Sequence, residues 1–189
     1  ELVYELMDPD KISKEVAECI YLGIVHDTGV FQYSCTSSKT MSIAGALMDR
    51  GIDYSAIIND TFFAKTFEQN RILGHALLKA RRYMEDRCIY TCITKEEMEQ
   101  FHVLPKHLEG IVSQLRATKD VEVAVFLYQS DTEDFKVSMR SGNLVDVSEI
   151  AVKYGGGGHA KAAGVTMKGT EEEIRDLILA DIASVLENV

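Results

Sequence analysis

A run of four glycines followed by a single histidine restricts the local fold of this chain more than any other feature. It lies in "KYGGGGHAKAAG", residues 153–164, where small residues surround the imidazole of His159. Glycine permits positive φ and carries no side chain, so the backbone N–H groups of such a run can approach an anion. A helix C-terminus needs only one glycine, and capping therefore leaves most of the run unexplained. The pattern predicts a tight loop where His159 donates a hydrogen bond to an anion or a proton to a leaving group.

The glycine run differs from the common nucleotide-binding loops. No Gly-Lys-Ser/Thr follows it, as in a Walker loop, and its spacing is not that of G-x-G-x-x-G. A purely structural turn remains the alternative to an anion site.

A second candidate site lies in the segment "FKVSMRS", residues 135–141. On a strand, side chains alternate between two faces, so Lys136, Ser138 and Arg140 would share one face. An ammonium, a hydroxyl and a guanidinium in a row can bind phosphate, and the guanidinium fork can do so with two parallel hydrogen bonds. A solvent-exposed outer face is the alternative interpretation.

A third candidate is Asp27 in "GIVHDTGVFQYS", residues 23–34. The periodicity of residues 11–26 predicts a helix, and Asp-Thr-Gly then ends it. A carboxylate at this end is disfavoured by the helix dipole by ~0.3–1 kcal/mol, and a nearby cation would reverse that sign. His26 and Asp27 would not share a face of a regular helix, so together they bind one ion only if the backbone turns. A simple helix stop is the alternative.

Composition limits the possible partners and location. The net charge of −10 argues against broad binding of long nucleic acid, but permits a small phosphorylated substrate held by a few cations. No apolar run approaches the ~20 residues of a membrane span. The four cysteines show no disulfide framework, which favours reduced core cysteines in a cytoplasmic protein. The chain opens like the middle of a helix, without an initiator Met, and we expect an upstream part to be missing.

The periodicity along the chain predicts an α/β fold with a boundary near residues 70–86. Residues 64–86 look like a long connecting helix between two domains. Capping boxes are expected at Thr94 and Thr170, and Asp146 is expected to cap another helix. The expected strands are 88–93, 121–128, 135–141 and 163–167, and the other expected helices are 37–50, 94–101, 107–115, 146–154 and 170–186.

Two segments together resemble the DHH phosphoesterase family, which is named for an Asp-His-His metal motif. "VSMRSGNLVDVSEIAVKYGGGGHAKAAG" resembles the substrate-binding C-terminal domain of that family. It is most similar to the branch of bifunctional oligoribonucleases and 3'-phosphoadenosine 5'-phosphate phosphatases, often called exopolyphosphatase-related. "GIVHDTGVFQYSCTSSKT" resembles the family's last metal motif. The resemblance implies part of a DHH-type α/β catalytic domain at 1–70, a linker helix at 71–86, and a smaller α/β domain with a mixed sheet at 87–189.

The resemblance also implies roles for particular residues. Asp27 would be a ligand in a site of two divalent ions, Mn²⁺ by family habit. Arg140 would hold a substrate phosphate, with Ser138 and Ser141 as weaker candidates. His159 would act on the terminal phosphate as a catalytic and binding residue, together with Gly156, Gly157 and Gly158. The implied substrates are short RNA oligonucleotides or phosphorylated nucleotides, and a homodimer is compatible with the family.

One departure from the family pattern limits these implications. The chain contains no Asp-His-His motif and no second cluster of acidic residues and histidines to complete a two-metal site. We therefore expect the intact parent to hydrolyse phosphoesters and this chain alone to be inactive. Two alternatives stay open: a nucleotide- or RNA-binding module without chemistry, and a pyrophosphatase or polyphosphatase of the same family.

Overall fold

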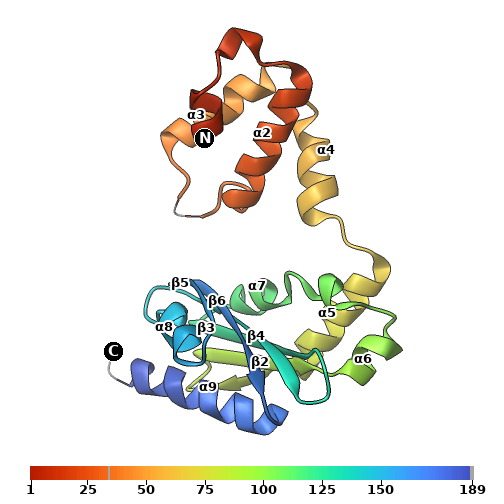
Figure 1. Cartoon of the computed structure of the whole chain (residues 1–189), viewed down its shortest axis with the longest axis vertical. Helices are drawn as coiled ribbons and strands as arrows, with labels where there is room; N and C mark the ends of the chain where they lie inside the picture. The colour runs from red at the N-terminus through yellow and green to blue at the C-terminus, as the bar shows by residue number, and fades with distance from the viewer. Residues whose placement is uncertain (34, 188–189) are drawn as a thin grey trace. The chain divides into compact units, whose positions relative to one another are not determined.

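The computed structural model describes residues 1–33 and 35–187, which form two compact units. The first unit comprises residues 1–65 and the second the residues from 66 onward. Figure 1 shows the chain coloured from red at the N-terminus to blue at the C-terminus. Within the described residues, no helix is long and apolar enough to cross a membrane.

All the regular elements of the first unit, within its described residues, are helices or helical turns. The predicted helix at 11–26 is confirmed as α2, which begins after the cap Ser13 and ends at Asp27. Ser37 caps α3 by a reciprocal pair of hydrogen bonds with Thr40. α2 and α3 bury a small apolar core around Tyr21 and Leu47. The elements are α1 (Leu2–Glu5), the 3-10 turn η1 (Pro9–Lys11), α2 (Lys14–Asp27), α3 (Ser38–Met48), α4 (Tyr54–Ile58) and the π-helical turn η2 (Asn59–Phe63).

The second unit is built on a six-stranded sheet of order β1-β2-β3-β4-β6-β5. Only β2 and β3 run parallel, and every other neighbouring pair is antiparallel. The predicted α/β fold with a mixed sheet is confirmed, although the short strands β1 and β5 were not expected. The strands are β1 (Arg81–Tyr83), β2 (Cys88–Ile93), β3 (Val123–Gln129), β4 (Asp134–Ser141), β5 (Gly157–His159) and β6 (Ala162–Lys168).

Helices cover the two faces of this sheet unequally. α8 (Val147–Lys153) and α9 (Glu171–Leu186) pack on one face, where their apolar side chains meet those of β2, β3, β4 and β6. On the other face, α5 (Phe67–Lys79), α6 (Lys95–Gln100), the 3-10 turn η3 (Pro105–Leu108) and α7 (Ile111–Arg116) cover β2 and β3. No buried residue of β4, β5 or β6 belongs to this second core among the described residues. One face of the sheet is therefore left uncovered over these three strands.

The expected connecting helix at 64–86 is wrong in its second half. α5 ends at Lys79, Ala80 is extended, and the chain turns through three residues with positive φ at 84–86 to pair β1 with β2. The charged segment forms a hairpin because Tyr83 packs edge-on against Tyr90 of the buried strand β2, at 6.4 Å between ring centroids. Ile72 and Ala76 of α5 lie fully buried against the sheet, so α5 is a core helix of the second unit.

The expected helix at 107–115 is also interrupted. Gly110 adopts φ +91, which separates η3 from α7. The left-handed conformation suits glycine, and it lets the chain change direction between two short helical turns. The capping boxes at Thr94 and Thr170 and the cap at Asp146 are confirmed.

The described cysteines are free thiols, as expected, but only two belong to a core. Cys88 and Cys92 are buried in β2, and burial raises the pKa of the Cys88 thiol to about 12. Such thiols are inert nucleophiles. Cys19 and Cys35 are exposed, which corrects the expectation that all the cysteines lie in a core.

Glu97 joins α6 to α5 through a half-buried network. One carboxylate oxygen accepts hydrogen bonds from Lys79 at 2.5 Å and from His75 at 2.7 Å, and the other accepts from the backbone of Thr94 at 2.8 Å. Burial disfavours the charged carboxylate, but these hydrogen bonds outweigh it and lower the pKa of Glu97 to about 2.

We expect Glu97→Gln to lower the free energy of unfolding by about 2 kcal/mol at neutral pH, because it removes charge-assisted hydrogen bonds between half-buried groups. The folded pKa lies below the reference value of 4.5, so this stabilisation is full above that pH and declines as the pH falls toward 2. Urea unfolding followed by circular dichroism should therefore show a smaller difference between the proteins near pH 3 than near pH 7. Glu99→Gln on the exposed side of α6 is the control, and a difference independent of pH would contradict the assignment.

Candidate functional site

The uncovered part of the sheet face lies over β4, β6 and β5, and we call it the open strip. Arg140 lies opposite Ala162, and Ala162 lies opposite His159. Directly opposed residues of antiparallel strands point to the same face. The open strip therefore consists of Lys136, Ser138 and Arg140 of β4, Ala162, Gly164 and Thr166 of β6, and Gly157 and His159 of β5.

Arg140 and His159 stand at the two sides of one row across the open strip. Neighbouring strands are ~4.8 Å apart, so the backbones of these two residues are separated by roughly 10 Å. Between them lies only the methyl group of Ala162, and the next row contains Gly164 and Gly157. The floor of the open strip is therefore low and smooth, with a guanidinium on one side and an imidazole on the other.

Both polar groups retain free donors. Nη1 of Arg140 donates to the carbonyl oxygen of Met139 at 3.0 Å, and no carboxylate among the described residues pairs with this guanidinium. His159 is exposed, and its ring contacts no polar partner within the described part of the chain. An arginine without a carboxylate partner can still form its bidentate pair with a phosphate.

The alternation predicted for residues 135–141 is confirmed. Lys136 is exposed and Ser138 and Arg140 are half-buried on the open strip, whereas the intervening residues point into the α8–α9 core. Nζ of Lys136 donates to Oγ1 of Thr166 at 2.7 Å, which fixes it at the far end of the open strip.

Ser141 lies on the other face of β4. Its side chain is buried, and its hydroxyl donates to the carbonyl oxygen of Ala160 at 3.2 Å. This bond ties the end of β4 to the turn between β5 and β6. Ser141 therefore contacts the protein's own backbone, whereas Ser138 faces the open strip.

Three of the four glycines in the run have structural reasons to be glycine. Gly155 ends α8 at φ +82, a left-handed conformation. A Cβ on Gly156 would overlap the carbonyl oxygen of Gly164, and Gly158, at φ +147, would bring one within 2.5 Å of Cα of Ala163. Gly157 differs, because a Cβ there would meet no atom within 4 Å and its φ is ordinary. The fold therefore does not require glycine at Gly157, which leaves the open strip bare at that point.

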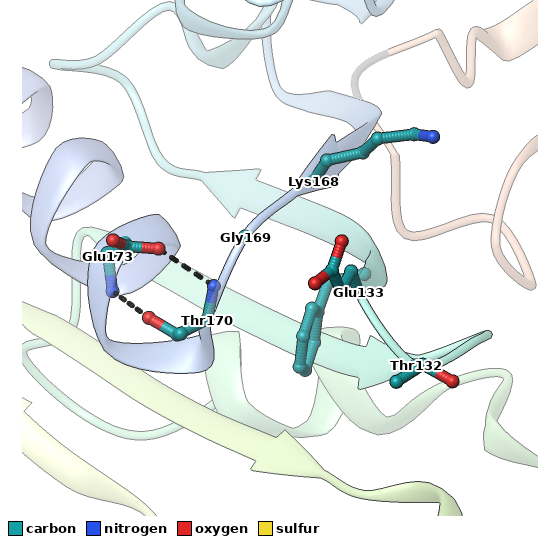
Figure 2. Close-up of a pocket in the computed structure, with 7 residues that line it drawn as sticks. Thr132, Glu133, Lys168, Gly169, Thr170 and Glu173 are labelled. Atoms are coloured by element: carbon teal, nitrogen blue, oxygen red, sulfur yellow. Dashed lines mark hydrogen bonds between the residues drawn. The ribbon is translucent and has the colours of Figure 1, made fainter.

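A depression of about 560 Å³ lies at the opposite end of β4, near the turn that joins β3 to β4. Figure 2 shows Lys168 extended away from Glu133 and Glu173, and Glu173 capping α9 through Thr170. Two carboxylates line this depression, so it is less suited to an anion than the Arg140 row. The candidate site is therefore the open strip, although the surface is more hollowed elsewhere.

Asp27 is exposed at the end of α2 and precedes an unusual turn. Gly29, Val30 and Phe31 all have positive φ, between +54 and +65. Left-handed backbone costs roughly 1–2 kcal/mol for each residue that carries a side chain, and it persists only where surrounding contacts enforce it. This left-handed turn reverses the chain directly after Asp27, a feature that the Asp-Thr-Gly pattern alone did not reveal.

The buried hydroxyl of Thr28 holds this turn together. It donates to the carbonyl oxygen of Ile24 at 2.6 Å and accepts from the backbone N–H of Phe31 at 3.0 Å. The carbonyl oxygen of Thr28 accepts from Gln32 and Tyr33, each at 2.9 Å. His26 turns away to contact Thr61 at 3.0 Å and the ring of Phe62. Asp27 and His26 thus have different surroundings, as their adjacency on a helix predicts.

The described residues do not themselves form a metal centre. Within residues 1–33 and 35–187, no three His, Cys, Asp or Glu side chains come together in an arrangement that could hold a metal ion. Asp27 supplies one carboxylate, which is fewer than the three or more protein ligands of a usual site. The metal role of Asp27 therefore stays a prediction.

The second unit is an α/β domain with a mixed sheet, and its sequence identifies the class to which this domain belongs. The DHHA1 domain family matches residues 85–188, which include β2 to β6 and every residue of the open strip. The chain belongs to this family.

The relatives of the chain make the comparison more specific. It is 29% identical over 187 residues to the "Bifunctional oligoribonuclease and PAP phosphatase NrnA" of Bacillus subtilis, covering 96% of this chain and 58% of that protein. It is 30% identical over 162 residues to the NrnA of Thermus thermophilus, covering 83% of this chain and 46% of that protein. The chain thus spans about half the length of these relatives.

Solved structures agree with this relationship. An exopolyphosphatase-related protein of Bacteroides fragilis superposes with a TM-score of 0.87 at 31% identity, over 99% of this chain and 54% of that one. A pGpG-specific phosphodiesterase of Vibrio cholerae superposes with a TM-score of 0.52 at 13% identity, over 96% of this chain and 64% of that one, and shows a shared fold only. The resemblance to the DHH family and to its oligoribonuclease branch, expected from two motifs, is confirmed.

Proposed function

We propose that this chain supplies the substrate-binding domain and one metal-binding loop of a metal-dependent phosphoesterase. Its substrates would be short oligoribonucleotides, cleaved from one end, and 3'-phosphoadenosine 5'-phosphate. The observation that carries the proposal is the row in which Arg140 and His159 flank Ala162 on the open strip. The names of the NrnA relatives support the same substrates. Catalysis is proposed for a protein of the relatives' length, and the 189-residue chain alone is expected to be inactive.

The residues predicted from the sequence to bind substrate have proposed tasks on the open strip and beside it. Arg140 binds two oxygens of one phosphate and neutralises the charge that builds up there during hydrolysis. His159 donates a hydrogen bond to the terminal phosphate and, when protonated, a proton to the leaving oxygen. Gly156, Gly157 and Gly158 keep the adjacent backbone accessible, while Ser138 is a further hydrogen-bond partner.

The metal role remains part of the proposal. Asp27 is proposed as one ligand of a pair of divalent ions, Mn²⁺ by preference, and the sequence of this chain holds no Asp-His-His motif to complete the set. The left-handed turn after Asp27 supports the assignment, because strained backbone is maintained most often at functional sites. We also propose a cytoplasmic location, which the free thiols support, and a homodimer.

Short substrates fit the charge distribution better than long ones. The chain carries a net charge of −10, so a long polyanion would meet repulsion beyond the open strip. A few local cations suffice for one or two nucleotides.

Nucleotide binding by the full 189-residue chain tests the proposal directly. We expect Arg140→Ala to weaken binding of AMP about 30-fold in isothermal titration calorimetry, since a charge-assisted bidentate pair contributes about 2 kcal/mol. Arg82→Ala is the matched control, because Arg82 lies on β1 and pairs with Asp86 at 3.0 Å. Equal affinities of the wild type and Arg140→Ala would show that the open strip is a solvated face.

A further inference from the structure

α7 packs on β3 and contacts β4 beside the open strip, and its last residue is Arg116. A Cβ on Gly142 would lie 2.6 Å from Nη2 of Arg116 and 2.2 Å from Oε2 of Glu122, so the two side chains share the space over Gly142. Gly142 follows Arg140 by two residues, and its N–H donates to the carbonyl oxygen of Glu122 at 2.9 Å, which continues the ladder between β3 and β4. Two residues of strand span about 7 Å and return to the same face. Arg116 thus extends the Arg140 side of the open strip by one position.

The guanidinium of Arg116 is buried in part and unpaired. Its Nε is buried without a hydrogen-bond partner, and no carboxylate of the described residues pairs with it. A buried polar atom without a partner is costly, and most such groups in folded proteins find one. An arginine that served only to cover apolar surface would place its charged end in water. The position of Arg116 is explained if its partner is an anionic ligand.

Glu122 is the charged neighbour that could compete for Arg116. Its Oε2 also lies over Gly142, but the two side chains do not form an ion pair. Its Oε1 accepts from the backbone N–H groups of Leu144 at 2.7 Å and Val145 at 3.3 Å, and these bonds hold Glu122 in place. A phosphate at this position is repelled by Glu122 and attracted by Arg116. Arg116 is therefore required if an anion is to bind there.

We propose that Arg116 forms a second phosphate subsite beside Arg140, so that the open strip selects ligands with two phosphate groups. Successive phosphates of an extended dinucleotide can then contact Arg140 and Arg116 in turn. A nucleoside bisphosphate presents the same chemistry. This inference rests on the proposed function, and it makes Arg116 a determinant of specificity between ligands with one and with two phosphates.

Paired titrations of the 189-residue chain with AMP and with 5'-phosphorylated diadenylate (pApA) test the inference. We expect Arg116→Ala to weaken pApA binding about tenfold and to leave AMP binding unchanged, whereas Arg140→Ala weakens both. Lys119→Ala is the matched control, because it removes an exposed cation three residues further along the chain. Gly142→Ala is a second variant, since its methyl group would displace the ends of both Glu122 and Arg116 without removing either charge.

The outcomes separate this inference from the proposed function. If Arg140→Ala weakens both nucleotides and Arg116→Ala changes neither, the second subsite does not exist and Arg116 only offsets the charge of Glu122. If Arg140→Ala also has no effect, the proposed function itself fails. Should Arg116→Ala not fold, Gly142→Ala must show the selective loss of pApA affinity, and equal loss for both nucleotides would overturn the inference.

Discussion

Asp27→Ala is expected to reduce Mn²⁺-dependent turnover at least about a thousandfold in a protein that has the full length of the NrnA relatives. The carboxylate is proposed as a metal ligand, and a metal-generated nucleophile is worth several kcal/mol of barrier, where ~4 kcal/mol corresponds to that factor. The assay would follow release of mononucleotide from labelled pApA.

Folding should be unaffected by the same substitution. Asp27 is exposed at the C-terminal end of α2, where removal of a negative charge is favourable by ~0.3–1 kcal/mol. Thermal unfolding should therefore show an equal or slightly higher Tm. Asp49→Ala is the control, because Asp49 is also exposed and caps the C-terminal end of α3. Turnover at the wild-type level in Asp27→Ala would place the metal elsewhere.

Local features of the fold could be read from the sequence because they depend on neighbouring residues. The capping boxes at Thr94 and Thr170 each involve a glutamate three residues away, and both form as expected. The segment after α5 was misread because its helical periodicity is local, whereas the packing of Tyr83 on Tyr90 that makes it a strand depends on the sheet. Tertiary packing overrode local propensity at this point.

The candidate site was predictable one residue at a time but not as an arrangement. Arg140 and His159 were each singled out by residue type and spacing. Their shared row depends on the register of β5 on β6, and β5 was not expected as a strand. Arg116 carried no signal in the sequence, because its contact with Gly142 joins a helix end to a strand end. The positive φ of Val30 and Phe31 was not predicted either, although the contacts of the buried Thr28 hydroxyl that hold this turn are local, to Ile24 and Phe31.

Substitutions at two adjacent positions of the glycine run, Gly158→Ala and Gly157→Val, should distinguish a glycine needed for folding from one needed for ligand binding. We expect Gly158→Ala to lower the free energy of unfolding by at least about 2 kcal/mol, because its φ of +147 disfavours a side chain and the Cβ would overlap β6. Gly157→Val should change stability by no more than about 0.5 kcal/mol, since a side chain there meets open space and valine suits a strand. Urea unfolding followed by circular dichroism measures both.

Gly157→Val, the variant expected to leave stability almost unchanged, should nevertheless weaken nucleotide binding. Gly157 lies opposite Gly164 on the open strip, so valine at this position would raise the floor of the row next to Arg140 and His159 and keep a phosphate from the backbone there. We expect AMP and pApA to bind Gly157→Val at least about tenfold more weakly, a loss of about 1.4 kcal/mol. A stable Gly157→Val protein with wild-type affinity would mean that the ligand does not cross this row, and that four glycines reflect the packing of β5 alone. Weaker nucleotide binding without loss of stability would show that ligand binding requires glycine at position 157, because the fold itself does not.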